Sequence, residues 1–223
     1  IAKVLDEISP DDFTIFNITI LNADMGLHTV EIDRDLFHRN DPNPIKNITL
    51  NEESILPVLY DYESYEYKPI TPLPTHIYKI IPNLRSQLGG PDGFYFGDLR
   101  IAFKSELILR KNLSLQTSMS AGVIDNYDEL KLASDSILPH VRTDIVQYLK
   151  QTKYFSLERL QLNYFNAISE NLYSKISAGF LEPMFGGYGG EILYKPFYND
   201  WAVGAEIWRV KQRSYDQKLD FLD

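Results

Sequence analysis

The chain has 223 residues, 44% of them hydrophobic and 13% aromatic, which suffices for one large or two small domains and argues against a disordered chain. A net charge of −9 excludes the broad basic surface with which proteins bind nucleic acid and other polyanions. The absence of cysteine excludes disulfides, thiol catalysis and cysteine-ligated zinc.

Residues 1–39 are predicted to form a small α/β or β unit. The segments 13–21 and 27–36 are rich in β-branched and aromatic residues, and residues 22–26 supply a turn between them. No ligand motif falls on this unit. It lies in an acidic part of the chain, since residues 1–95 carry 15 acidic and 7 basic side chains, against 16 and 15 in residues 96–223. The two parts are therefore expected to face different surroundings.

Residues 40–93 combine prolines with tyrosines and predict a connector. Proline lacks a backbone donor and fixes φ, so we expect an extended segment with short turns rather than a sheet. The tyrosines could pack on a neighbouring surface or stack on a carbohydrate, and the sequence leaves both readings open. The prolines are Pro42, Pro44, Pro57, Pro69, Pro72, Pro74, Pro82 and Pro91, and the tyrosines are Tyr60, Tyr62, Tyr65, Tyr67 and Tyr78.

Residues 94–223 show a period of two that predicts antiparallel strands. In 99–109 and 113–123 the odd positions are mostly apolar and the even ones mostly polar, and residues 110–112 between them indicate a hairpin turn. Four further strands are predicted at 155–166, 171–181, 188–195 and 201–211. A short helix is predicted within about 138–151, because Pro139 suits a first helical turn and Val141, Ile145, Tyr148 and Leu149 recur at three to four residues.

The strand pattern favours an antiparallel outer-membrane β-barrel, or part of one. Each candidate is near the 9–11 residues that a tilted membrane strand needs, and no apolar run is long enough for a membrane helix. A soluble barrel or sandwich is the alternative, since it also predicts alternation. Aromatic residues near strand ends resemble interfacial girdles. They are Phe94, Tyr95, Phe96, Tyr154, Phe155, Phe165, Tyr194, Phe197, Tyr198 and Trp201.

Few residues suggest chemistry. His28, His38, His76 and His140 are scattered without metal-ligand spacing, and we predict neither a metal nor a cofactor. Glu182, Glu191 and Glu206 could supply the carboxylate pair of a glycosidase, but the alternative is that Glu191 and Glu206 pair with Lys175 or Arg159. The glycines of 184–191 lack a phosphate-loop ending and predict a bulged or sharply turned hairpin.

Several motifs resemble the YjbH family of exopolysaccharide-biosynthesis outer-membrane proteins, whose capsule-operon relatives include GfcD. They are 88–94 (LGGPDGF), 125–128 (DNYD), 138–144 (LPHVRTD), 179–197 (GFLEPMFGGYGGEILYKPF), 201–204 (WAVG) and 212–217 (QRSYDQ). The resemblance covers roughly 80–217. It implies an outer-membrane β-barrel that acts with polysaccharide-export partners and has no catalytic residues. It also implies structural roles for its motif residues Arg142, Asp144, Glu182, Gly186, Gly187, Gly189, Gly190, Arg213 and Asp216.

The function expected from these observations is a non-catalytic barrel component of exopolysaccharide or capsule secretion. The N-terminal unit would be periplasmic, and the barrel would contact the polysaccharide, other secretion proteins and outer-membrane lipid, but not nucleic acid. Its polar lumen would be lined by Lys104, Glu106, Arg159, Lys175, Glu191 and Glu206. The alternative is a soluble or periplasmic protein that binds or modifies carbohydrate.

Overall fold

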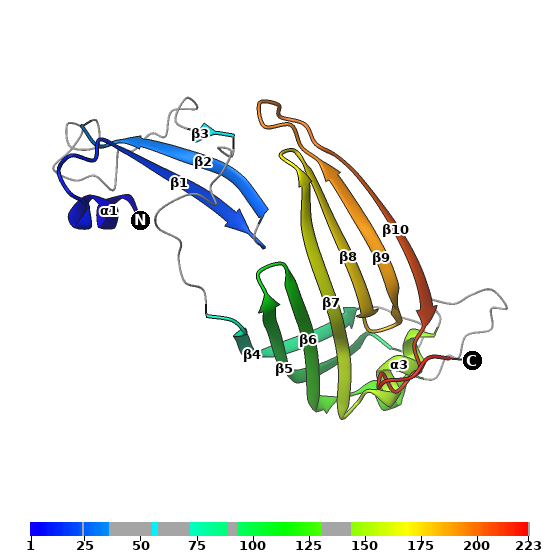
Figure 1. The fold of residues 1–223 in the computed structure, drawn as a ribbon. Helices are drawn as coiled ribbons and strands as arrows, with labels where there is room; N and C mark the ends of the chain where they lie inside the picture. Colours follow the sequence, from blue (N-terminus) through cyan, green and yellow to red (C-terminus); the bar gives the residue numbers. More distant parts are fainter. Residues whose placement is uncertain (24, 36–54, 58–71, 89–92, 131–143, 223) are drawn as a thin grey trace. The chain divides into compact units, whose positions relative to one another are not determined.

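A computed structural model describes residues 1–23, 25–35, 55–57, 72–88, 93–130 and 144–222 (Figure 1). The chain divides into two compact units. One contains residues 1–70 with 166–174 and 193–204, and the other contains residues 71–165, 175–192 and 205–223. Among the described residues, no helix has both the length and the apolar character needed to cross a bilayer.

The N-terminal segment contains a helix and a small antiparallel sheet. Helix α1 spans Ala2–Ile8, and strands β1 (Ile15–Asn22) and β2 (Met25–Asp33) form the hairpin that the sequence predicts, with β3 (Ile55–Leu56) added to β2. The core of this sheet includes Phe16, Met25 and Thr29. Arg34 binds the Asp6 carboxylate of α1 at 2.7 Å, which ties the helix to the end of β2.

The larger sheet is an open antiparallel meander of seven strands in the order β10-β9-β8-β7-β6-β5-β4. This confirms the mainly β, antiparallel fold, whereas the described strands do not close into a barrel, since β4 and β10 lie at opposite edges (Figure 1). The strands are β4 (Thr75–Leu88), β5 (Tyr95–Arg110), β6 (Leu113–Asp125), β7 (Phe155–Ser169), β8 (Leu172–Phe180), β9 (Phe185–Tyr194) and β10 (Val203–Gln212).

The register separates the sheet into two chemically different faces. Between β5 and β6, Leu107 is opposite Leu115 on one face, whereas Lys104 is opposite Ser118 on the other. Because side chains alternate along a strand, this register gathers apolar residues on one side and polar residues on the opposite side. We call these sides the apolar face and the polar face.

The apolar face is exposed in the described structure. Ile101 of β5 is 52% exposed, Ile176 of β8 is 61% exposed and Ile207 of β10 is 79% exposed. Large apolar side chains with this exposure are also found in β4, including Ile80 and Leu84. A continuous exposed apolar surface of this kind is typical of a surface that meets lipid or another protein.

Strand β4 corrects the prediction that residues 40–93 form a connector rather than a sheet. It pairs with β5 from Thr75 opposite Ile108 to Leu88 opposite Tyr95, and Pro82 lies in its middle. Proline is compatible with an edge strand because an edge has backbone N–H groups that face no partner. A proline in a sequence therefore does not by itself exclude a strand at the edge of a sheet.

Two short helical segments cover one end of the polar face. They are η3 (Tyr127–Glu129) and α3 (Ile145–Gln151), and α3 confirms the later part of the predicted helix, while residues 138–143 lie outside the described residues. Phe96, Tyr127 and Leu130 form a buried cluster with Val146 and Leu149 packed against it. Phe96 is therefore a core residue rather than a girdle residue, because it points towards the helical cover.

The glycine-rich segment corrects a second prediction. Gly186, Gly187, Gly189 and Gly190 lie inside strand β9 and not in a hairpin turn. A Cβ at Gly189 would lie 2.3 Å from the Trp208 ring, and one at Gly187 would lie 2.1 Å from the Arg209 carbonyl oxygen. The close backbone approach that glycine permits is thus present, but it serves contact with β10.

Candidate functional site: the polar face of the sheet

Buried Arg100 of β5 organises one end of the polar face. Its Nε donates to Ser120 Oγ at 2.8 Å, and one terminal nitrogen donates to the Thr152 carbonyl at 2.9 Å and the Ser156 hydroxyl at 3.3 Å. The other terminal nitrogen binds the Asp98 carboxylate at 2.8 Å. Arg100 is fully buried, so this charge is stable there only because these partners replace its water.

The Asp98 carboxylate joins this arginine to the sheet edge. It accepts from Arg85 of β4 at 2.8 Å and from the Tyr127 hydroxyl of η3 at 3.1 Å. Burial, with the charge and hydrogen bond of Asp98, raises the pKa of Tyr127 to about 12, so the hydroxyl remains a donor at neutral pH. One carboxylate thus links β4, β5 and η3.

Arg213 fixes the segment that follows β10. It is fully buried and donates to the carbonyls of Leu157 at 2.7 Å, Glu182 at 2.9 Å, and Gln217 and Lys218 at 3.0 Å each. Its guanidinium also lies over the Phe180 ring, 4.4 Å from the centroid. Burial lowers the pKa of Arg213 to about 10, which leaves it a cation at neutral pH.

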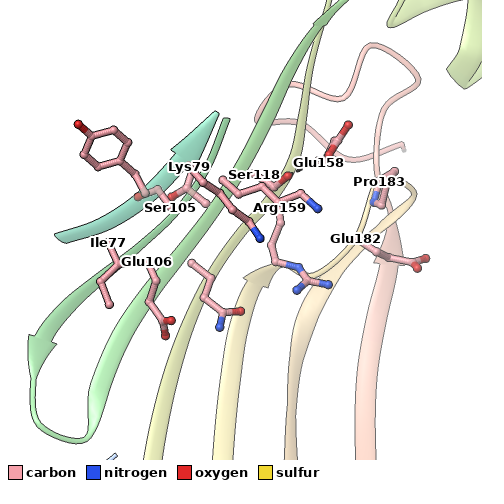
Figure 2. Close-up of a pocket in the computed structure, with 13 residues that line it drawn as sticks. Ile77, Lys79, Ser105, Glu106, Ser118, Glu158, Arg159, Glu182 and Pro183 are labelled. Carbon is pink, nitrogen blue, oxygen red and sulfur yellow. Dashed lines mark hydrogen bonds between the residues drawn. The ribbon is translucent and has the colours of Figure 1, made fainter. Parts of the chain in front are cut away.

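A pocket of about 520 Å³ lies on the polar face beside this network (Figure 2). Its walls come from β4, β5, β6, β7 and the turn after β8. In the register of β6 and β7, Ser118 is opposite Arg159 and Met119 is opposite Leu157, so Glu158 has no residue opposite it. This bulge in β7 lets the adjacent charged side chains of Glu158 and Arg159 both reach the pocket. The charged and amide lining residues are Lys79, Lys104, Glu106, Gln116, Glu158, Arg159 and Glu182.

Two of these pocket residues are held by neighbours. Glu158 accepts hydrogen bonds from the hydroxyls of Ser118 at 2.9 Å and Ser120 at 2.6 Å. Arg159 donates through Nε to the Leu181 carbonyl at 3.0 Å, which anchors the turn containing Glu182. The pocket floor is therefore built by hydrogen bonds between neighbouring strands.

Polar contacts continue along the same face from β7 to β10. Asn163 Oδ1 accepts from Gln161 and from Ser177 of β8, at 2.7 Å each. Two residues before Ser177, Lys175 binds the Glu191 carboxylate of β9 at 2.7 Å and lies 6.0 Å from the Trp208 ring. The Trp208 Nε1 donates to Glu206 at 2.9 Å.

The structure brings the predicted lumen residues to one face, in two groups. Lys104, Glu106 and Arg159 line the pocket, whereas Lys175, Glu191 and Glu206 lie farther along, on β8 to β10. Of the carboxylates considered for a glycosidase, Glu191 is paired with Lys175 and Glu206 accepts from Trp208. Glu182 alone among these three lines the pocket.

The predicted motif residues are mainly involved in local structure. Asp144 accepts from Gln212 at 3.0 Å and from the Tyr215 hydroxyl at 3.2 Å, and Asp216 accepts from Ser214 at 2.9 Å. Arg142 lies outside the described residues. Among the described histidine, aspartate and glutamate side chains, no group of three is arranged to hold a metal ion.

The predicted lumen residues do not include Lys79, Arg100 and Glu158, which the structure places on the polar face. Lys79 lies in the proline-rich segment, and Glu158 lies in a bulge that no period of two can reveal. Arg100 could have been found, because it and Asp98 are charged residues at the even positions that precede Lys104.

Comparison with known proteins identifies a family. The YjbH family model, described as exopolysaccharide biosynthesis protein YbjH, matches residues 1–223. The chain is also 35% identical over 148 residues to the uncharacterized lipoprotein YjbH of Escherichia coli (strain K12), a match covering 65% of this chain. That match spans only 21% of the length of the curated relative. No solved structure matches the chain.

Proposed function

Since the chain belongs to the YjbH exopolysaccharide biosynthesis family, we propose that its large sheet is part of an outer-membrane β-barrel whose polar face contacts an exopolysaccharide on its way to the cell surface. In this proposal the chain is non-catalytic. The N-terminal unit is periplasmic and binds other secretion proteins, in keeping with the relative that is named a lipoprotein.

The observation that carries this proposal is the opposite chemistry of the two faces. The apolar face exposes large aliphatic side chains along β4, β5, β8 and β10, whereas the polar face holds a hydrogen-bonded set of charged and hydroxyl groups around a pocket. Barrels in the outer membrane have an apolar exterior and a hydrated polar interior. Strands of 9 to 16 residues, such as β8 and β5, are long enough to cross at a tilt.

The described sheet has two open edges, at β4 and β10, which a membrane barrel must pair. Strands β4 and β10 each have one side without a partner strand among the described strands, and unpaired backbone groups are not tolerated in lipid. In this proposal both edges are paired with further strands of the barrel.

Cysteine labelling tests which face meets lipid. The chain contains no cysteine, so single substitutions report one position each. In native outer membranes of cells that produce the full-length protein, Ser118→Cys should react with a charged, water-soluble maleimide. Ile101→Cys and Ile176→Cys should react only after denaturation. Equal reactivity of all three in intact membranes would refute the membrane orientation.

A separate assay tests the non-catalytic assignment. The purified full-length protein is expected to leave the exopolysaccharide of its host at its original chain length, as measured by size-exclusion chromatography. Shortening of the glycan by wild type but not by a folded Glu182→Gln or Glu191→Gln variant would show that the protein is a hydrolase or lyase.

A further inference from the structure

Two lysines on the polar face oppose each other without a neutralising partner. Lys79 of β4 is directly opposite Lys104 of β5 in the antiparallel register, an arrangement in which like charges repel. On the same pair of strands, Arg85 is opposite Asp98 and forms an ion pair with it. Within the described part of the chain, neither lysine forms a hydrogen bond or ion pair.

A third cation faces the same pocket. Arg159 uses its Nε to bind the Leu181 carbonyl, and its terminal nitrogens have no partner among the described residues. Figure 2 shows Lys79 and Arg159 lining one hollow together with Glu106. The Glu158 carboxylate is already bound by Ser118 and Ser120. The pocket lining thus carries three cationic side chains beside the carboxylates of Glu106, Glu158 and Glu182, and no ion pair joins the two sets among the described residues.

We propose that this pocket binds the carboxylate of an acidic sugar residue, a proposal that rests on the glycan-contacting function above. An anion between Lys79, Lys104 and Arg159 would offset their mutual repulsion through charge-assisted hydrogen bonds. Sugar hydroxyls would be recognised by Gln116 and by the carboxylates of Glu106 and Glu182, which also line the pocket. A volume of about 520 Å³ is within the range of small-ligand sites.

The net charge of −9 does not conflict with such a site. Most of the negative charge belongs to residues 1–95, whereas residues 96–223 carry 16 acidic and 15 basic side chains. An attraction within a few ångströms depends on the groups in the pocket, since charges beyond about 10 Å are largely screened at moderate salt.

The probe pair is trigalacturonate and its fully methyl-esterified form, which differ in charge and little in shape. Binding to the full-length protein in detergent is measured by isothermal titration calorimetry. We expect trigalacturonate to bind at least tenfold more tightly than the ester, and this preference should decrease as salt is raised. The double variant Lys79→Gln/Lys104→Gln should lose the preference while binding the ester as wild type does.

The matched control is Lys195→Gln/Lys211→Gln, which removes the same charge from exposed positions outside the pocket and should retain the preference. Folding of each variant is checked by heat-modifiable gel mobility, and relief of repulsion should leave the pocket variant at least as stable as wild type. Equal affinity of wild type for acid and ester would overturn the carboxylate site but leave glycan contact standing. Binding of neither probe would overturn the carboxylate site and also count against glycan contact.

Discussion

At the scale of single residues, the most constrained groups are two buried arginines. Arg100 joins Asp98 to hydroxyl and carbonyl partners, and Arg213 gathers four carbonyl oxygens from three separate segments. A planar guanidinium offers five donors in a fixed fork, which an ammonium group cannot reproduce. Each arginine therefore connects several parts of the chain that are far apart in sequence.

Arg213→Lys tests this role directly. Lysine keeps the charge but cannot reach all four carbonyls, and each buried group left unpaired costs about 1–3 kcal/mol. We expect the free energy of unfolding to fall by at least about 2 kcal/mol, taking two or more lost hydrogen bonds of this size. Thermal unfolding in detergent measures the effect. Arg110→Lys at the exposed end of β5 is the control, and an equal response of both variants would contradict the prediction.

The Asp128 and Lys153 pair predicts a pH effect. The hydrogen bond and charge of Lys153 lower the pKa of Asp128 from its usual 3.8. A carboxyl whose pKa is lower in the folded state stabilises the fold above its unfolded pKa and loses this contribution as pH falls through the folded value. The melting temperature of Asp128→Asn should thus lie slightly below that of wild type at pH 7.

This difference should shrink as the pH falls below the usual aspartate pKa of 3.8 towards the lower pKa of Asp128 in the folded protein. Because both partners are at the surface, high salt should reduce it as well. A difference that grew as the pH was lowered would show that the carboxylate does not stabilise this end of the sheet.

At the scale of elements, β9 depends on the absence of side chains. Trp208 of β10 covers Gly189, and a Cβ on Gly186 would lie 2.9 Å from both the Phe180 and the Phe221 ring. Gly179 in β8 has φ +128° and would place a Cβ 2.2 Å from the Leu160 carbonyl oxygen. These glycines let neighbouring strands and rings approach the backbone, which explains the density of glycine in a strand that would otherwise be weakened by it.

Two adjacent glycines provide a matched test of this explanation. A Cβ on Gly189 would lie 2.3 Å from the Trp208 ring and 2.6 Å from the Ile207 carbonyl, whereas one on Gly190 would meet only the Lys175 carbonyl at 3.7 Å. Gly189→Ala should therefore destabilise the sheet by about 1–3 kcal/mol, as overpacking does, and Gly190→Ala should be tolerated. Tryptophan fluorescence during urea unfolding measures the stability of both variants. A larger loss of stability in Gly190→Ala than in Gly189→Ala would contradict the explanation.

At the scale of the whole molecule, the orientation of the sheet is the property on which function depends. Leu115 of β6 is on the apolar face, between Leu107 of β5 and Leu162 of β7. Ser118, three residues later, faces the polar pocket. If the apolar face meets lipid, a charge at position 115 must lose its water, whereas one at position 118 keeps it.

Leu115→Arg and Leu107→Arg should therefore each destabilise the folded protein by about 2–4 kcal/mol near the bilayer midplane and impair its assembly. Ser118→Arg should be tolerated. Heat-modifiable gel mobility in isolated outer membranes compares the variants, with immunoblot amounts as the control. Wild-type folding of Leu115→Arg, or selective failure of Ser118→Arg, would mean that the faces are reversed or that no lipid contacts the sheet.

Much of this architecture could be predicted from the pattern of residues alone. The period of two located β5 to β8 and β10 closely, and the terminal part of α3 followed from helical spacing. The family also follows from the motifs, as the match over residues 1–223 confirms. Local periodicity is informative here because each strand has one polar and one apolar face.

Other features depended on partners that are distant in sequence. Strand β4 contains Pro82 and is identified only by its pairing with β5, and Lys79 becomes a pocket residue only through that register. The bulge at Glu158 and the carbonyl partners of Arg213 likewise arise where separate segments meet. The sequence by itself thus determined the alternation of polar and apolar residues and the family, because both depend on residues that are neighbours along the chain. The tertiary structure decided the edge strand, the pocket and the buried junctions, because these depend on which strands lie side by side.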